Sequence, residues 1–419
     1  MIPGFGKLQW MVFWELLRVF ALTLLGLTGM FVIVGLVQQF SALGLSAGQL
    51  LKIIPLFVPY TLPYTVPATT LFACCVVYGR LANDNEVVAI KAAGIDLLTM
   101  LRPAALLGVV ATAATLSISF SLIPRSQVLM YEEAVREPEE VLYNMLKRER
   151  VLGRNGKSQY SMYVRDVQGK RLLDVVIKRG NKERHKLIPN SNFSGREDYD
   201  YLARTSQARL SVDLERRMLT VDADRWNIAD YSNASSVYSV GTQPYEIELP
   251  DIFSVQEIKT RPIALEWPEL HVRLGELHAE RVAINASKAA SADAGAKSDD
   301  PAFRKEVQNQ QNHYAQQIKD NDRNVRNVEY EFANRPALAF GCLLFAMIGA
   351  PVGLLSNRSD YLSTFVVCFL PTILIYYPIV LSGRGLAIEG KVPAAFGAWG
   401  ANLIVGAGAL LLVFKAIRR

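Results

Sequence analysis

The feature that most constrains the fold is the clustering of apolar residues into long runs free of Asp, Glu, Lys and Arg. A helix needs about 20 apolar residues to cross a bilayer, and each run reaches or exceeds that length. The sequence therefore predicts six transmembrane helices, with one long charged segment, from Arg125 to Arg335, between the third and the fourth. The six runs are Val19–Leu51, Ile53–Gly79, Pro103–Pro124, Pro336–Asn357, Tyr361–Gly383 and Val392–Phe414.

Basic residues near the ends of these runs predict the orientation, because cytoplasmic loops carry an excess of Lys and Arg. We expect both termini in the cytoplasm and the charged segment on the outer side, although Lys52, Arg384 and Lys391 oppose this trend. The net charge of +6 fits the bias, and no basic run interleaved with aromatic residues indicates nucleic-acid binding. The residues that follow the trend are Lys7, Arg80, Lys91, Arg102, Arg358, Lys415, Arg418 and Arg419.

Four prolines recur at every fourth position in the second run. Each removes a hydrogen bond from one face of a helix, which predicts a kinked or irregular first half. Such backbone is tolerated at membrane depth only against protein or a wet cavity, so we expect this run to face the interior of the bundle. These residues are Pro55, Pro59, Pro63 and Pro67.

A short polar segment links the second and third runs. Asn83 followed by Glu86 has the spacing of a capping box, and Gly94 is placed to end a helix in the left-handed conformation. A short helix at about residues 81–95 follows, with Val87 and Ile90 on one face, suited to lie along the cytoplasmic membrane surface. An ordinary interfacial connector is the alternative interpretation.

The long charged segment divides into two parts. Residues 125–265 contain alternating stretches bounded by turn signals, which predict an antiparallel all-β sandwich or jellyroll. Residues 266–334 are rich in helix formers, with Leu270, Leu274 and Leu277 in phase, and predict a polar helical insertion or linker of two helices with a flexible tip. Residues 1–124 and 335–419 then form the membrane bundle. The predicted strands are Gln159–Val167, Leu172–Lys178, Ala208–Leu214, Met218–Asp222 and Tyr245–Leu249.

The sequence indicates no catalytic chemistry of its own. It contains no phosphate-binding loop of the Gly-x-x-x-x-Gly-Lys-Ser/Thr type, so we expect no nucleotide hydrolysis by this chain, and no cofactor or metal site is predicted. The four histidines lie outside the runs in no recognisable pattern. Glu15 and Arg18 are the ionisable residues nearest to membrane depth, and their spacing predicts a local ion pair. An intramembrane protease or a proton-coupled carrier is therefore disfavoured.

Two motifs carry a resemblance to a known family. The first is Gly79-Arg-Leu-Ala-Asn-Asp-Asn-Glu-Val-Val-Ala-Ile-Lys-Ala-Ala-Gly-Ile95, and the second is Glu331-Phe-Ala-Asn-Arg-Pro-Ala-Leu-Ala339 leading into Phe345-Ala-Met-Ile-Gly-Ala-Pro-Val-Gly353. Together with the order of the runs, they resemble the LptF/LptG (YjgP/YjgQ) family of lipopolysaccharide-export permeases. The likeness covers nearly the whole chain apart from a polar stretch at about residues 286–327.

The resemblance implies a non-enzymatic subunit of an ABC transporter that extracts lipopolysaccharide, or a related lipid, from the inner membrane and passes it to a periplasmic bridge. Expected partners are a cytoplasmic LptB-like ATPase, a sister permease and an LptC- or LptA-like bridge protein. It also implies a periplasmic jellyroll whose open edge continues the sheet of the bridge. The residues matched to the ATPase-coupling segment are Arg80, Asn83, Asp84, Glu86, Lys91 and Gly94.

The sequence departs from the LptG-type pattern at the outer end of the first run. Basic residues that would meet lipid phosphates are not evident there, where Gln38 and Gln39 stand, and Lys52 is the nearest substitute. An LptF-like role is therefore favoured. A second class of function stays open, in which the chain is a non-transporting membrane scaffold or sensor whose outer β domain binds envelope partners. Copurification with an ATPase would distinguish the two.

Overall fold

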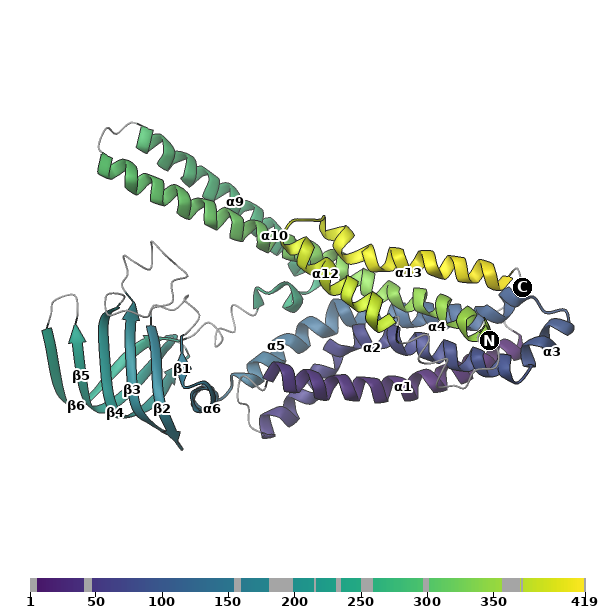
Figure 1. Ribbon diagram of the computed structural model, residues 1–419, viewed down its shortest axis with the longest axis horizontal. Helices are drawn as coiled ribbons and strands as arrows, with labels where there is room; N and C mark the ends of the chain where they lie inside the picture. Colours follow the sequence, from purple (N-terminus) through teal and green to yellow (C-terminus); the bar gives the residue numbers. More distant parts are fainter. Residues whose placement is uncertain are drawn as a thin grey trace. The chain divides into compact units, whose positions relative to one another are not determined.

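The computed structural model describes residues 6–40, 47–153, 160–180, 199–214, 216–230, 235–249, 259–296, 301–355, 370 and 372–417. The chain divides into two compact units. A helical unit contains Met1–Val32, Phe57–Gln127 and Thr260–Arg419, and a sheet unit contains Ile33–Leu56 and Val128–Lys259. Figure 1 shows the helices and strands of both units with their labels.

Five helical segments in the described residues are long and apolar enough to cross a membrane. A further apolar helix, Leu374–Ile388, is shorter, and most of the remaining predicted run from Tyr361 lies outside the described residues. The prediction of six spans therefore stays a prediction at this segment. The five segments are Lys7–Gln38, Gly48–Asn83, Leu97–Ala134, Phe303–Leu354 and Ala394–Phe414.

The bounds of the helices differ from the charge-free runs. Helix α2 begins at Ala47 and contains Lys52, because one lysine near a helix end can extend to the interface. The π turn Ile118–Leu122 precedes Pro124, and a further helix, Ile123–Ala134, contains Pro124 in its first turn, where proline is tolerated, and continues the chain to Ala134. These elements are α1 Lys7–Phe40, α2 Ala47–Asn83, α4 Leu97–Ser117, η1 Ile118–Leu122 and α5 Ile123–Ala134.

The proline-rich helix α2 is continuous, so the predicted irregularity does not appear in its secondary structure, and the alternative of a kink stays a prediction. Neighbouring helices and hydroxyl side chains can support a proline-containing membrane helix. The Tyr377 hydroxyl donates a hydrogen bond of 2.5 Å to the carbonyl of Tyr64, which ties α12 to α2 beside these prolines. The carbonyls that the prolines leave without an intrahelical donor are those four residues before each proline. The expected interior position is confirmed, since 78% of the most apolar stretch of α2 is buried.

Close packing between α2 and helix α10, Pro301–Leu355, depends on two glycines of the second motif. A Cβ atom at Gly349 would lie 2.8 Å from the Cβ atom of Cys74, and one at Gly353 would lie 2.8 Å from the carbonyl oxygen of Cys75. Both distances are far inside van der Waals contact, so these positions accept no side chain without movement of α2.

The carboxyl-terminal part of the helical unit consists of the π turn η5 Thr372–Tyr376 and the helices α12 Tyr377–Ile388 and α13 Ala394–Ile417. Asn402 of α13 is buried and joins α13 to η5 and to α10. Its side-chain oxygen accepts a hydrogen bond of 3.0 Å from the Tyr376 hydroxyl, and its nitrogen donates one of 2.6 Å to the carbonyl of Ala337.

The predicted pair of polar helices is confirmed. Helix α9, Trp267–Ala296, lies beside the first half of α10, and α10 then continues without a break into the apolar stretch (Figure 1). The in-phase leucines Leu270, Leu274 and Leu277 pack against Val325 and Val328 of α10. The Ala-, Ser- and Asp-rich stretch from about Ala286 to Asp300, expected between the two helices, belongs to α9 as far as Ala296, and residues 297–300 lie outside the described residues.

The described residues of the sheet unit form six antiparallel strands in the order β1-β2-β3-β4-β5-β6 (Figure 1). The predicted strands fall within or overlap β2–β6, because alternation of apolar and polar residues places one face in the core. The described strands form a meander in sequence order, and the jellyroll topology stays a prediction. The strands are β1 Val151–Leu152, β2 Tyr160–Gln168, β3 Arg171–Gly180, β4 Tyr199–Asp213, β5 Met218–Asp230 and β6 Ser235–Glu248.

A helix that sequence analysis missed, α6 Pro138–Glu149, packs on this sheet. Its buried Val141, Leu142 and Leu146 join the sheet core, which includes Leu172 and Val221. The helix was hidden by its composition, because acidic residues at its start and basic residues at its end surround only one apolar face. One of the turn signals that bound the predicted strands is Gln168-Gly169, and it is confirmed by the φ of 59° at Gly169. The others, at residues 155–156 and 180–181, lie wholly or partly outside the described residues.

Candidate functional site

The candidate site is the short helix α3, Glu86–Ala92, between α2 and α4. The predicted capping box is wrong, because Asn83 is the last residue of α2 and not the first of α3. Burial of Leu81 and Ala82 extends α2 beyond Arg80. The chain then reverses at Asn85, whose φ is 59° and whose side chain makes no capping hydrogen bond.

The carboxyl-terminal end of α3 forms as predicted. Gly94 has a φ of 79°, and its amide donates a hydrogen bond of 2.9 Å to the carbonyl of Lys91. The amide of Ile95 donates one of 3.3 Å to the carbonyl of Ile90. This pair of bonds is the Schellman motif, in which a left-handed glycine satisfies the last carbonyls of the helix.

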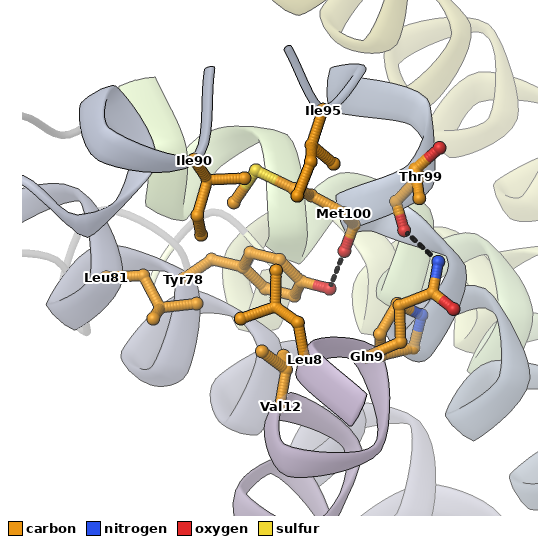
Figure 2. A pocket seen from close by; sticks show the side chains of 10 residues that line it. Leu8, Gln9, Val12, Tyr78, Leu81, Ile90, Ile95, Thr99 and Met100 are labelled. Carbon is orange, nitrogen blue, oxygen red and sulfur yellow. Dashed lines mark hydrogen bonds between the residues drawn. The ribbon is translucent and has the colours of Figure 1, made fainter. Parts of the chain in front are cut away.

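One face of α3 is seated on the ends of α1, α2 and α4, whose side chains line a common pocket with Ile90 (Figure 2). Val87 and Ile90 pack against Leu97 and Met100 at the start of α4. Beneath them lies an apolar cavity of about 20 Å³, just large enough for one water-sized molecule. The cavity is lined by Leu8, Gln9, Val12, Tyr78, Leu81, Ile90, Ile95, Thr99, Met100 and Pro103.

Polar groups of this seat are satisfied within the chain. The Tyr78 hydroxyl donates a hydrogen bond of 2.7 Å to the carbonyl of Met100, and the side-chain nitrogen of Gln9 donates one of 3.0 Å to the carbonyl of Thr99 (Figure 2). The cavity is too small and too apolar to hold a lipid or a nucleotide. What α3 offers is therefore its outer surface.

The outer surface of α3 carries most of the residues predicted to couple to a partner. Asn83, Asp84, Lys91 and Gly94 are exposed, and Glu86 is half-buried. Val88 is 63% exposed between them, and Leu98 just beyond α3 is 49% exposed. An exposed apolar side chain surrounded by charged and amide groups is suited to contact a protein groove.

Arg80 differs from the other predicted coupling residues. Its Nη2 atom lies 2.6 Å from Oε2 of Glu15 on α1, so the pair joins two helices. The expected ion pair between Glu15 and Arg18 is wrong, because Glu15 turns to Arg80 and Arg18 is exposed. Sequence spacing favoured Arg18 because it considers only neighbours on one helix.

The residues predicted to contact lipid belong to the sheet unit, and their contact with lipid stays a prediction. Gln38 is exposed, and the side chain of Gln39 lies outside the described residues. Lys52 is engaged by Glu133, with 2.9 Å between its Nζ atom and Oε1 of the carboxylate.

A larger concave site in the sheet unit has a volume of about 700 Å³ and is lined by Glu137, Glu139, Glu140 and Lys170 among others. A hydrogen bond from Glu137 raises the pKa of Glu140. Tyr143 at its wall donates to the carbonyl of Lys170 at 2.9 Å and accepts from the Leu210 amide at 2.8 Å. The carboxylates that line this concave site disfavour the binding of lipid phosphates through like-charge repulsion.

The second motif contributes a buried ion pair that sequence analysis did not single out. Arg335 and Glu331 lie one turn apart on α10, with 3.7 Å between Nε and Oε2. Nη2 of Arg335 also donates hydrogen bonds of 2.9 Å to the carbonyls of Pro262 and Leu265. The pair therefore ties α10 to the turn that precedes α9.

These features define a class of protein: a multi-pass helical membrane protein that carries a separate antiparallel sheet and exposes a short helix between two of its long ones. Residues 10–415 match the family described as lipopolysaccharide export system permease LptF/LptG. The match spans nearly the whole chain, so the protein belongs to this family and is a permease of lipopolysaccharide export in the inner membrane. A comparison with curated proteins found no match.

Proposed function

We propose that the chain is the transmembrane permease subunit of an ABC transporter that extracts lipopolysaccharide from the inner membrane and passes it to a periplasmic bridge. The observation that carries the proposal is α3, a short helix seated on α2 and α4 with its polar and apolar outer surface exposed. In this role α3 docks into a cytoplasmic LptB-like ATPase, which supplies the hydrolysis that this chain lacks. A sister permease completes the transporter.

The proposed orientation places α3 and both termini in the cytoplasm and the sheet unit in the periplasm. Both described edges of the sheet are formed by single-neighbour strands, β1 and β6. The longer edge strand, β6, is suited to pair with a strand of an LptC- or LptA-like bridge protein through main-chain hydrogen bonds. In this orientation, residues 266–334 form a helical insertion that is not part of the lipid path. The proposal also includes contact between the lipid and Gln38, Gln39 and Lys52.

The scaffold alternative is disfavoured by family membership alone, since the continuous helix α2 gives no evidence for an irregular lipid-facing wall. A membrane scaffold would need no ATPase. The alternative would gain support if no ATPase copurified with the intact protein.

The test reverses one charge on the docking surface. Glu86→Lys replaces the acidic residue of the first turn of α3, and we expect at least about tenfold less copurified ATPase, corresponding to about 1.4 kcal/mol. The matched control is Glu306→Lys, which makes the same change at an exposed site of α10 far along the chain. Unchanged ATPase recovery with Glu86→Lys, or an equal loss with Glu306→Lys, would contradict the docking role.

A further inference from the structure

Helix α1 is peripheral over most of its length. Only 17% of its most apolar stretch is buried, against 78% for α2. Gln9, Val12 and Leu16, in its first turns, are buried, and a hydrogen bond of 3.1 Å between the Thr28 and Thr65 hydroxyls is a contact further along. The amino-terminal end of α1 is thus a principal attachment, and it lies at the seat of α3 (Figure 2).

The first polar contact, or tie, at this end of α1 is made by Gln9, and both polar atoms of its side chain form hydrogen bonds. Its nitrogen donates to the carbonyl of Thr99 at 3.0 Å, and its oxygen accepts from the amide of Gly6 at 2.9 Å. The residue is 5% exposed. A buried carboxamide with both groups hydrogen-bonded fixes the position of α1 relative to α4, because a shift of either helix would leave a polar group unpaired in an apolar environment.

The second tie is the ion pair between Glu15 of α1 and Arg80 of α2. Arg80 lies six residues before the start of α3. Their side chains are 22% and 39% exposed, so the pair is shielded from water on most sides. Such a pair holds helices more firmly than a fully exposed one. Between the two ties, Val12 and Leu16 pack against Tyr78 and Leu81. These apolar contacts are non-directional, so they do not fix the register of α1 on α2.

We propose that Gln9, Glu15 and Arg80 are positioning residues that make α1 move together with α3 when the ATPase displaces it. The inference rests on the proposed docking of α3. It also divides the coupling segment, since Arg80 then acts inside the chain and the exposed residues of α3 act toward the partner. The apolar contacts alone would let α1 slide, whereas the two polar ties hold its register against α2 and α4.

A charge exchange tests the proposal in the complete transporter reconstituted in vesicles that contain lipopolysaccharide. Arg80→Glu and Glu15→Arg are compared singly and together, and the readout is lipid released per ATP hydrolysed at full ATPase occupancy. We expect each single change to lower this ratio about fivefold or more, and the double exchange to restore it to within about twofold of the native value. Gln9→Met should lower the ratio in the native background and in the double exchange alike.

Two controls keep the result interpretable. Arg18→Glu reverses an exposed charge three residues from Glu15 and should leave the ratio unchanged. Arg80→Lys keeps the cation, and should retain more of the ratio than Arg80→Glu if the pair matters, even where the reversed variants unfold more easily.

Either of two results would overturn the proposal: a double exchange as impaired as Arg80→Glu alone, or loss of the ATPase from the complex in Arg80→Glu. The second result would place Arg80 on the docking surface. Failure of the docking itself is seen separately, as unchanged ATPase recovery with Glu86→Lys.

Discussion

Arg335 offers the sharpest test of how the helical unit is held together. Its side chain is 5% exposed, donates to two carbonyls at 2.9 Å and faces the buried carboxylate of Glu331. Arg335→Met removes the cation, leaves both carbonyls without their donor and strands the carboxylate. Breaking one partner of a buried pair costs about 3–5 kcal/mol, and we expect Arg335→Met to fall in this range.

The double variant Glu331→Gln with Arg335→Met separates the two contributions. Neutralising the stranded carboxylate should recover at least about 1 kcal/mol, because the uncompensated charge is the larger part of the cost. Arg335→Lys should be intermediate, since an ammonium keeps the charge but lacks the planar guanidinium that faces Glu331 with Nε while Nη2 donates to both carbonyls. Arg323→Met, at an exposed arginine of the same helix, should change stability by less than about 0.5 kcal/mol.

The measurement is unfolding in mixed micelles by titration with a denaturing detergent. Tryptophan fluorescence is a suitable signal, because the Trp267 ring lies 5.0 Å from the Phe332 ring beside this junction. A cost below about 1 kcal/mol for Arg335→Met would refute the reasoning. So would a double variant less stable than Arg335→Met alone, because the carboxylate would then not be the group left uncompensated.

Two further predictions concern single positions. Asn402→Ala removes both hydrogen bonds that join α13 to Tyr376 and to α10. At about 0.6–1.7 kcal/mol for each bond, we expect a loss of stability of about 1–3 kcal/mol in the same titration, and a smaller loss for Tyr376→Phe. Equal stability of Asn402→Ala and the native chain would contradict this prediction. Gly94→Ala places a side chain at a φ of 79° with open space around it, so only backbone strain of about 1–2 kcal/mol is expected. Hydrogen exchange of the Ile95 amide should then become about fivefold faster or more, and unchanged exchange would show that the turn does not need glycine.

The end of α3 could be predicted from sequence, whereas its start could not. A left-handed glycine after a short amphipathic stretch is a local signal, and Gly94 forms the expected turn. The spacing of Asn83 and Glu86 is also a local signal, but burial of Leu81 and Ala82 extends α2 over the position where capping was expected. Tertiary packing therefore overrides the capping preference at this point.

The strands and the paired helices were predictable for a similar reason. Alternation along β2 and β3, and the leucine spacing of α9, are repeated patterns in which each residue supports the next. Helix α6 has only one apolar face of a few residues in a charged sequence, and its place depends on the sheet that it covers. The start of α2 is also misplaced from sequence, because the charge of Lys52 separates two apolar runs. In the structure α2 begins at Ala47 and includes Lys52, whose side chain pairs with Glu133.

Arg80 shows where a resemblance by segment stops being informative about single residues. A motif assigns one role to all residues from Arg80 to Gly94, because they are consecutive in the chain. On the helix end, however, Arg80 points to Glu15, while Asp84, Val88 and Lys91 are exposed. Contacts between residues 65 positions apart carry no signal in a single sequence, so only the packing of α1 against α2 could separate these roles. The positioning role proposed for Arg80 therefore predicts that a charge change there needs a compensating change at Glu15, whereas a partner-facing residue needs one in the partner.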